Sequence, residues 1–472
     1  MKNRTILISL LLCLNSVLYA QKQKTISITS FGANGLDKVN DTEAFGKAAK
    51  YIQSEGGHVR LIIPKGIYYV GRDAVRKDSF AYGVNILTLK DVQNVTISGE
   101  SGAIIRYVSG LKYGSYDPST HKAVTTKAPF LKVPFARAIG CTFQFIDCRK
   151  ITIENLELDG NNGALRKGGD WGDIGTQLRH DGVNVVRSKD ITIRNMNIHH
   201  YALDAMAIGN PGNNGPDNIL IESCTLSYNG RQGLSLIGGN GITCRNTKMQ
   251  HTGRAGISSA PSAGLDIEAE GGRMNRNGLF ENCEFINNAG CAVVADGGNS
   301  ADMVFKQCTF WGVTTWSVWV NNPRFLFEDC NFYGSFVAGY ITTNDADATR
   351  FVNCRFEDKM YQGKKVFGSY LLECNGRKKM HFENCSFTAN LCKLIWYNGS
   401  GKYIPDELGT MNNCNLTFRY KGLANNAFLG VLCNMKLKNN TLNILTPSAK
   451  KHYLISKNNL DQGNNNWDVN KP

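Results

Sequence analysis

The chain has 472 residues, of which 42% are hydrophobic and 19% are charged, and it carries a formal net charge of +14. These proportions exclude a disordered chain and supply ample apolar material for a core. The positive charge favours either an acidic partner or simply a soluble surface. A polyanionic polysaccharide fits better than nucleic acid, since no nucleic-acid recognition module is visible.

The first twenty residues have the layout of a secretory signal peptide. A basic start at Lys2 and Arg4 is followed by an apolar run from Ile6 to Leu14, and Ala20 ends the segment. We therefore expect residues 1–20 to be removed and the mature protein to be secreted or periplasmic. No other stretch has the apolar length of a membrane span, so we expect a soluble monomer with no membrane partner.

An amphipathic helix is predicted over residues 40–53. Its apolar side carries Phe45, Ala48, Ala49 and Ile52, and Asp41 or Thr42 could cap it. We expect this helix to plug the first coil of the fold, with residues 56–70 following as strand, turn and strand.

Four short segments of this region carry a family resemblance, and they are Phe31-Gly-Ala, Asn40-Asp-Thr-Glu-Ala-Phe, Gly56-Gly and Ile63-Pro-Lys-Gly-Ile-Tyr. Together they resemble the start of the pectate-lyase-like superfamily, which includes polygalacturonases, rhamnogalacturonases, uronan epimerases, polysaccharide lyases and phage tailspikes. The resemblance implies an all-β, right-handed parallel β-helix with an N-terminal capping helix. It says little about the reaction, because such folds host many functions.

A strand pattern that recurs every ~20–30 residues supports the same fold. Its central copies are Asp181-Gly-Val-Asn-Val, Asp204-Ala-Met-Ala-Ile, Gln232-Gly-Leu-Ser-Leu and Ala263-Gly-Leu-Asp-Ile. Units that hold only strands and turns predict a parallel β-helix, with one domain over residues 21–456 and a C-terminal cap or tail over residues 457–472. Strand alternation predicts an inward apolar set and an exposed ribbon that carries Asp181, Asp204, Gln232, Asn184, Ala207, Ser235 and Asp266.

The cysteines follow the repeat. Fifteen cysteines less Cys13 of the signal peptide leaves fourteen, and about half of these, from Cys224 to Cys414, mostly recur in contexts such as Glu-Asn-Cys-Glu-Phe. This spacing predicts a ladder of small buried residues with free thiols in place of a disulfide framework.

Two insertions interrupt the early coils, at about residues 109–140 and 160–180. They carry several Lys and Arg residues together with tyrosines and Trp171, a mixture suited to a charged, ring-bearing substrate. A solvated loop is the equally weighted alternative.

The central strands also resemble the catalytic segments of polygalacturonases. That family carries Asn-Thr-Asp-Gly, Asp-Asp, Gly-His-Gly and Arg-Ile-Lys on successive coils, and this chain has Arg179-His-Asp-Gly, Leu203-Asp and Arg231-Gln-Gly at the first three places. The resemblance implies catalytic roles for Asp181 and Asp204. Because Leu203 and Gln232 depart from the pattern and no Arg-Ile-Lys follows, a standard polygalacturonase mechanism is doubtful. The alternative for both aspartates is a turn-capping role.

A second pair of carboxylates lies at Asp266 and Glu268. Two residues apart on one strand, their Cα atoms should be ~6.6 Å apart, near the ~6.5–9.5 Å that separates the carboxyls of an inverting glycosidase. Glu270 could complete a Ca²⁺ site with them, although no cofactor is required. The adjacent His199 and His200 are expected to form a turn more readily than a metal site, because further ligands could not be placed.

Three functions fit this surface. The favoured one is an exported glycoside hydrolase that cleaves an acidic polysaccharide with Asp181, Asp204, Asp266 and Glu268 as catalytic residues. A polysaccharide lyase or C5-epimerase is the first alternative, and a non-catalytic glycan-binding β-helix is the second. In each case the expected substrate-binding residues are Arg231, Gln232, His180, Arg254 and Trp171.

Overall fold

A computed structural model describes residues 22–77, 80–124, 135–169, 178–312, 316–334, 336–366, 368–374, 378–397, 405–419, 428–445 and 453–466. The expected signal peptide, Cys13 and Trp171 lie outside these ranges.

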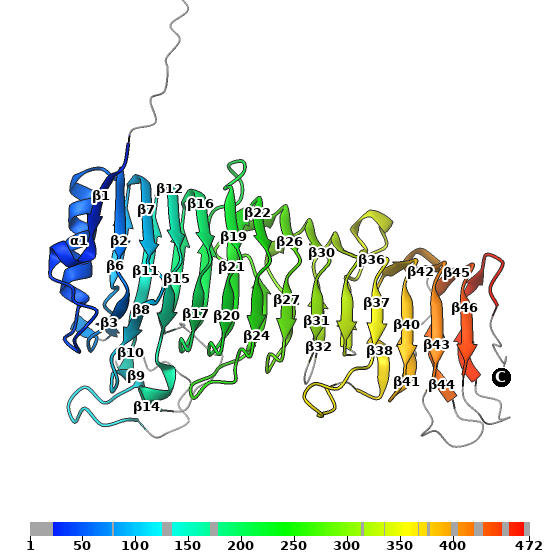
Figure 1. Ribbon diagram of the computed structural model, residues 1–472. Helices are drawn as coiled ribbons and strands as arrows, with labels where there is room; N and C mark the ends of the chain where they lie inside the picture. Colours follow the sequence, from blue (N-terminus) through cyan, green and yellow to red (C-terminus); the bar gives the residue numbers. More distant parts are fainter. Residues whose placement is uncertain are drawn as a thin grey trace, which may run out of the picture.

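The chain winds into a parallel β-helix in which each coil adds one strand to each of three long parallel sheets (Figure 1). Sheet I consists of β6 (Leu87–Lys90), β11 (Gly140–Ile146), β15 (His180–Val186), β18 (Asp204–Gly209), β21 (Gln232–Asn240), β24 (Ala263–Ile267), β28 (Val293–Ala295), β32 (Trp316–Val320), β35 (Phe336–Ala338), β38 (Tyr370–Cys374), β41 (Lys393–Tyr397), β44 (Phe428–Cys433) and β47 (Tyr453–Lys457), with β25 (Met274–Arg276) and β29 (Asn299–Ser300) attached beside β21.

Sheet II consists of β1 (Lys24–Ser27), β2 (Val59–Ile63), β7 (Gln93–Gly99), β12 (Arg149–Glu154), β16 (Lys189–Arg194), β19 (Ile219–Glu222), β22 (Ile242–Arg245), β26 (Gly278–Glu281), β30 (Met303–Lys306), β33 (Phe325–Glu328), β36 (Thr349–Val352), β39 (Met380–Glu383), β42 (Gly409–Asn412), β45 (Met435–Lys438) and β48 (Leu460–Asp461). Sheet III consists of β3 (Gly66–Val70), β8 (Ala103–Tyr107), β13 (Glu157–Asp159), β17 (Asn197–His199), β20 (Thr225–Ser227), β23 (Lys248–Gln250), β27 (Glu284–Ile286), β31 (Thr309–Trp311), β34 (Asn331–Tyr333), β37 (Arg355–Glu357), β40 (Ser386–Ala389), β43 (Asn415–Phe418) and β46 (Thr441–Ile444).

The register of sheet I is the one that the repeat predicts. The inward residues Val183, Met206, Leu234 and Leu265 stand opposite one another on successive strands, and all are fully buried. The neighbouring column runs through Asn184, Ala207, Ser235 and Asp266. Because a slip of one residue would turn the apolar set to the wrong face, the core dictates this alignment.

The N-terminal end of the coil is closed by α1 (Thr42–Ser54), and its predicted apolar side is buried. Asp41 occupies the N-cap position, as predicted, but its side chain makes no capping hydrogen bond. Asn40 Oδ1 accepts the hydrogen bond from Thr42 N at 3.0 Å, whereas the side chain of Asp41 is turned back to accept from Asn34 N. Asn40 therefore satisfies the first amide of this helix.

The turns between sheets II and III carry two ladders. The first is a row of left-handed asparagines, as at Asn246 and Asn282, where Asn282 Nδ2 donates to Asn246 Oδ1 at 2.8 Å. Asparagine tolerates this backbone conformation better than other side chains except glycine. The next residue in the turn is commonly a buried cysteine, as at Cys308 and Cys330, and each of these two thiols donates to a phenylalanine carbonyl of the preceding coil at 3.4 Å.

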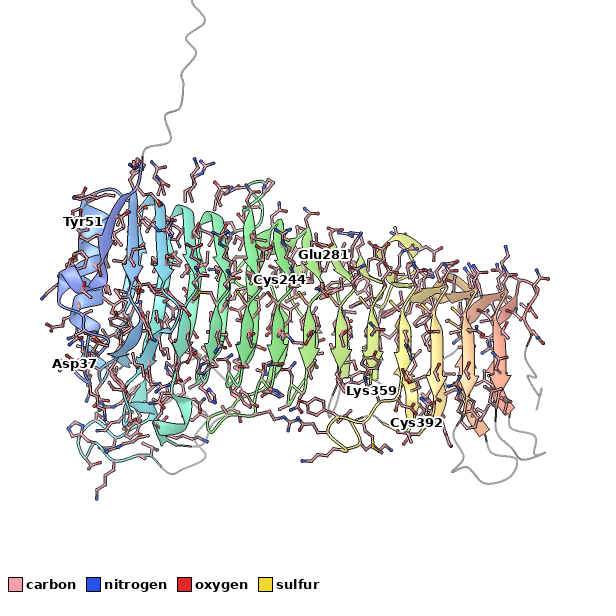
Figure 2. All side chains as sticks on the ribbon, in the orientation of Figure 1. Asp37, Tyr51, Cys244, Glu281, Lys359 and Cys392 are labelled. Carbon is pink, nitrogen blue, oxygen red and sulfur yellow. The ribbon has the colours of Figure 1, made fainter. Side chains whose placement is uncertain are left out.

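All cysteines of the described residues have free thiols, as predicted. Cys244, for example, is fully buried, whereas Glu281 of the adjoining strand is partly exposed (Figure 2).

Parts of the two insertions pair with each other in a small separate sheet. It contains β4 (Val75–Lys77), β5 (Phe80–Tyr82), β9 (Lys112–Ser115), β10 (Ala136–Arg137) and β14 (Arg166–Gly168). This small sheet gives the insertions backbone partners of their own, so that their described parts are ordered structure.

The coil continues beyond the boundary expected at residue 456, since that boundary falls inside β47 and β48 adds a further strand to sheet II. Asn465 Oδ1 then accepts from Asn440 N at 3.0 Å and continues the turn pattern. In the ranges described, no helix is long and apolar enough to cross a membrane.

Candidate active site

Three aspartates meet on four consecutive strands of sheet I. Asp204 on β18 stands opposite Gln232 on β21, which stands opposite Ala263 on β24. Asp181 on β15 belongs to the same row, and its Oδ1 accepts from Asp204 N at 3.4 Å. Asp266 lies three residues beyond Ala263 on β24. With strands ~4.8 Å apart, this geometry gathers the three carboxyls into one cluster, which we call the aspartate cluster.

The sequence led us to expect the aspartates on an exposed surface of the sheet, but other parts of the chain cover the aspartate cluster. Asp181 and Asp204 are 3% exposed and Asp266 is 4% exposed. One cover is Tyr113 on β9 of the small sheet. It is fully buried, and the charges of Asp181 and Asp204 help to raise its pKa. The insertion that supplies Tyr113 therefore buries a face that strand alternation alone would leave open.

A second cover comes from the segment between β23 and β24, which folds back over earlier coils. Asn162 clamps it, because Ile257 N donates to Asn162 Oδ1 at 2.6 Å and Asn162 Nδ2 donates to Ile257 O at 2.8 Å. Further along, Ser259 N donates to Gly230 O at 3.1 Å, next to the turn that leads into β21. The segment thus lines the turns at which the strands of the aspartate cluster begin.

Burial makes the two neighbouring aspartates weak acids. Removal from water raises the pKa of Asp204 well above its usual value, and the negative charges of Asp181 and Asp266 raise it further. Burial also raises the pKa of Asp181 to about 6, although Arg179 and Arg231 oppose the rise. Asp204 Oδ1 is buried with no hydrogen-bond partner in the part of the chain that the structure describes, which further disfavours its charged form.

Asp266 has a different environment from the other two aspartates. Gln232 Nε2 donates a hydrogen bond to Asp266 Oδ2 at 2.6 Å. A donor directed at a carboxylate oxygen favours the ionised form. The cluster therefore contains a carboxyl whose pKa is raised well above its usual value beside one that accepts a hydrogen bond from an amide.

Arginines surround the aspartate cluster. Arg179 Nε lies 3.6 Å from Asp181 Oδ2, and the charge of the half-buried Arg231 lowers the pKa of both Asp181 and Asp204. Arg273 packs further along β21, where a Cβ on Gly238 would meet Asn210 O and, at 2.7 Å, the Arg273 side chain. Glycine is therefore needed at position 238 for these two close approaches.

Several expected site residues do not fit their assigned roles. His180 cannot contact substrate, because it is fully buried and its ring packs against Tyr107 and Tyr201, with ring centroids 4.8 and 5.1 Å away. Its Nδ1 accepts from Ala202 N at 3.0 Å, and burial lowers its pKa to about 3. The histidine is a neutral core residue. The repeat did not reveal this, because His180 comes before the regular alternation of β15.

The other expected residues divide between the cluster and the surface. Gln232 is fully buried and donates to Asp266, so it does not offer the exposed substrate contact that we expected. Glu268 lies just past the end of β24 and is exposed, so it does not share the environment of Asp266 as the predicted pair would. Arg254 is exposed, and its Nε donates to Asn287 O at 3.4 Å.

A row of rings along the ends of the sheet III strands was missed. His200 stacks on Tyr228 at 5.2 Å, and Tyr228 stacks on His251 at 4.6 Å. Further along, Lys359, labelled in Figure 2, lies over the rings of Trp311 and Tyr333. The signal in the sequence was positional, since His200, Tyr228 and His251 each directly follow a sheet III strand.

Within the described ranges, one group of side chains could hold a metal ion, and it consists of Asp159, His199 and His200. Their possible metal-ligating atoms all lie within 4.8 Å of one another. Asp266, Glu268 and Glu270 do not form such a group in those ranges, so the Ca²⁺ site considered for them gains no support.

Comparison with known proteins identifies the family. The family model described as "right handed beta helix region" matches residues 141–322 and 275–407, which together cover more than half of the chain. The chain belongs to the right-handed beta helix family. The described coils and the capping helix α1 agree with the pectate-lyase-like β-helix fold that the sequence led us to expect.

Individual relatives of this right-handed beta helix protein are remote. It is 24% identical over 209 residues to the polygalacturonase ADPG1 of Arabidopsis thaliana, covering 37% of this chain and 45% of that enzyme. The chain thus spans less than half of this curated relative. Two solved structures from Azotobacter vinelandii share its fold, the A-modules of the mannuronan C-5 epimerases AlgE6 and AlgE4, with TM-scores of 0.55 and 0.53. The first is 14% identical and covers 94% of this chain and 99% of the module, and the second is 11% identical and covers 93% and 100%.

Proposed function

We propose that this protein is an enzyme that acts on an acidic polysaccharide, and more specifically a glycoside hydrolase. The observation that carries the proposal is the aspartate cluster, in which Asp204 has a strongly raised pKa while Gln232 directs a donor at Asp266. Two carboxyl groups with different protonation states in one site are the requirement for glycoside hydrolysis by acid and base.

Asp204 is the proton donor in this proposal. As a carboxylic acid at neutral pH, it protonates the glycosidic oxygen while the bond from that oxygen to the anomeric carbon breaks. Asp181 or Asp266, as a carboxylate, takes a proton from the water that forms the new bond to the anomeric carbon. Leu203 stands where polygalacturonases carry a second aspartate, so the acid role moves to Asp204.

The acidic substrate is inferred from charge. Arg179 and Arg231 border the aspartate cluster, and guanidinium groups bind carboxylates and sulfates through paired hydrogen bonds. The formal net charge of +14 would attract a polyanion over a longer range. The similarity to a polygalacturonase agrees with this substrate class. The layout of residues 1–20 supports action outside the cytoplasm.

The test is a screen of the purified protein against a panel of acidic polysaccharides, with two measurements on each reaction. A hydrolase produces new reducing ends and no increase in ultraviolet absorbance. A lyase produces new reducing ends and an increase in ultraviolet absorbance, because it leaves an unsaturated sugar. An epimerase releases neither but exchanges the C5 hydrogen with deuterated water. Either of the last two results would overturn the hydrolase assignment and keep the substrate class.

A pair of variants ties the activity to the aspartate cluster. Asp204→Asn should lower kcat by about 10²–10⁴-fold, the usual contribution of a general acid. Asp91→Asn is the matched control, because Asp91 is exposed and pairs with Lys90 on the surface. Equal activity of wild type and Asp204→Asn on every polysaccharide cleaved would refute the assignment. Binding without turnover of any kind would favour a glycan-binding role.

A further inference from the structure

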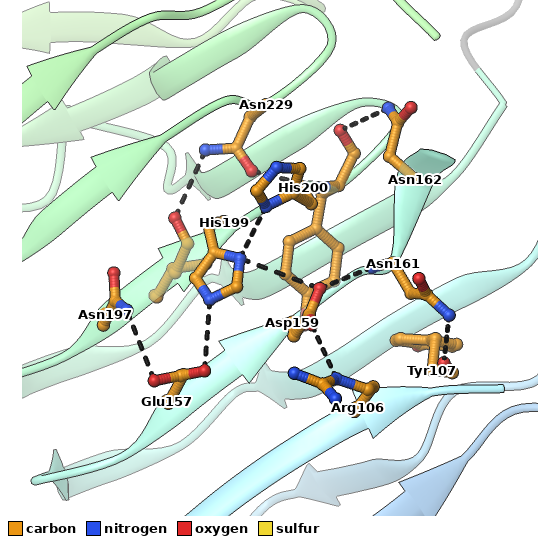
Figure 3. A network of polar contacts seen from close by, with 12 residues as sticks. Arg106, Tyr107, Glu157, Asp159, Asn161, Asn162, Asn197, His199, His200 and Asn229 are labelled. Carbon is orange, nitrogen blue, oxygen red and sulfur yellow. Dashed lines mark hydrogen bonds and ion pairs between the residues drawn. The ribbon is translucent and has the colours of Figure 1, made fainter. Parts of the chain in front are cut away.

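A second polar site lies on sheet III, on the other side of the turn that leads into Asp204. Asp159 ends β13, His199 ends β17, and His200 follows in the turn (Figure 3). His199 and Asp159 stand opposite each other in the register of the two strands. None of the three side chains belongs to the aspartate cluster.

The ligand atoms of these three residues converge on one another. His199 Nδ1 lies 2.7 Å from His200 Nδ1 and 3.7 Å from Asp159 Oδ1. Adjacent residues on a strand point to opposite faces, so two neighbouring histidines would ordinarily diverge. The backbone of His200 is left-handed, with φ of 56°, and this turns its ring to the same side as His199.

Two imidazole nitrogens at this separation can share only one proton, so at least one of them presents a lone pair. Neutral imidazole nitrogen is the form that coordinates metal ions.

The surroundings hold each of these groups in place. Glu157 Oε1 lies 3.4 Å from His199 Nε2, so the other ring nitrogen, Nδ1, is left for a ligand. Arg106 Nε donates to Asp159 Oδ2 at 2.7 Å, and Asn161 N donates to Oδ1 at 2.8 Å, which fixes the carboxylate with Oδ1 3.7 Å from His199 Nδ1. A carboxylate on the far nitrogen of a coordinating histidine is the usual outer support of a metal site.

Stacking and charge complete the site. The ring of Tyr228 lies parallel to that of His200, with 5.2 Å between centroids and 6° between planes. Asp159 and Glu157 carry two negative charges against the one positive charge of Arg106, so the site has an excess of negative charge for a cation. The side chains of His199 and Asp159 retain 12% and 11% exposure, so an ion can reach them.

We propose that Asp159 Oδ1, His199 Nδ1 and His200 Nδ1 form a binding site for a divalent transition-metal ion, with Zn²⁺ as the best fit. Two histidines and one carboxylate are typical Zn²⁺ ligands, and three protein ligands leave a fourth position for water or a substrate oxygen. The sequence revealed the two histidines, and the coil supplies the missing third ligand from the preceding rung. Because the metal ion would join two coils at the turn before β18, it would also stabilise the backbone that leads into Asp204.

The proposal is tested by metal binding to the untagged, metal-stripped protein, independently of any enzymatic activity. Calorimetric titration with Zn²⁺ should give one site, and Co²⁺ should give the visible absorption of a nitrogen- and oxygen-ligated ion. His200→Gln should lower the affinity at least tenfold, and Glu157→Gln should lower it by about 10–100-fold, as loss of an outer support does.

His251→Gln is the matched control. His251 occupies the equivalent turn position two coils on and stacks on the same tyrosine, but Asn287 Nδ2 lies 2.7 Å from its Nδ1 in place of a carboxylate. This variant should bind Zn²⁺ as wild type does. Zn²⁺ should also raise the Tm of wild type and not that of a folded His199→Gln variant. Absence of stoichiometric binding to wild type, or an equal loss in His200→Gln and His251→Gln, would overturn the proposal.

Discussion

Gln232 Nε2 donates a hydrogen bond of 2.6 Å to Asp266 Oδ2, from one coil of sheet I to the next. Gln232 stands opposite Ala263, three residues before Asp266, so the amide reaches diagonally across the outer face of the sheet. The side chains are respectively fully buried and 4% exposed. In a site of low polarity a hydrogen bond is stronger than at the surface, and its loss leaves a buried carboxyl oxygen without that donor.

Replacement of Gln232 by leucine should therefore lower kcat/KM by about 10²-fold, as loss of one preorganised donor does in other enzymes. Gln232→His restores an N–H donor and should retain more activity than Gln232→Leu. The measurement is the rate on the polysaccharide found in the screen. If the two variants were equally active, the donor itself would be irrelevant to the reaction.

The pH dependence of activity should be bell-shaped. If Asp181 acts as the base, it must be ionised, and its pKa of about 6 makes the rate rise as the pH increases through that value. Asp204 must be protonated, so the rate falls at higher pH as this carboxyl ionises. Because the two groups interact, the profile reports apparent values for the pair. A rate already maximal at pH 4 would contradict the assignment of Asp181 as the base.

Asp181→Asn should make the protein more stable at pH 8 while removing activity. The pKa of Asp181 is higher in the folded state than its usual 3.8, so this group favours folding below pH 3.8 and loses that effect as the pH rises through about 6. A rise of this size corresponds to about 3 kcal/mol of folding free energy. Asparagine has no charge to bury and keeps an oxygen for Asp204 N. Urea unfolding of wild type and Asp181→Asn at pH 4 and at pH 8 gives the gain in stability of the variant at each pH. A gain of the same size at both pH values would contradict the burial of a charge at Asp181.

The cysteines give a prediction that needs no substrate. All fourteen that follow Cys13 are buried and free, so a thiol reagent should label few of them in the native protein and all fourteen after unfolding without a reductant. Mass spectrometry of the labelled protein counts them. Labels that appear only after reduction would show disulfide bonds that the coil does not accommodate.

The fold could be predicted from the sequence because a solenoid repeats its constraints. Each coil requires inward apolar residues such as Val183 and Met206, and a turn residue such as Asn246 that tolerates a left-handed backbone. Every copy adds independent support for the same register. The repeat gives no such support at the helix N-terminus, where Asp41 is the N-cap as predicted but its side chain accepts from Asn34 N and leaves Asn40 to cap Thr42 N.

The site could be predicted only in part, since its aspartates come from the repeat but their cover does not. Register places Asp181, Asp204 and Asp266 together, and any aligned coil would show this. Tyr113, which lies close enough for the charges of Asp181 and Asp204 to act on it, comes from an insertion with no repeat of its own. The inward turn of His180 likewise depends on tertiary packing against tyrosine rings. Non-local contacts of this kind leave no periodic signal in the sequence.

The stacked phenylalanines of sheet II provide a test of how the coil is held together. The ring of Phe327 lies between those of Phe305 and Phe351, with centroids 4.9 and 5.0 Å away, and all three are fully buried. Phe327→Ala should cost about 3–5 kcal/mol, because it removes a buried ring and leaves a cavity between two coils. Leu326→Ala is the matched control, since Leu326 lies on the outer, half-buried face of the same strand and should cost less. Urea unfolding measures the stability of both variants.

Since each coil contacts mainly its neighbours, hydrogen exchange in Phe327→Ala should increase most in β30, β33 and β36 and little in β1 and β2. A uniform increase along the whole chain would instead indicate that the coils unfold as one cooperative unit.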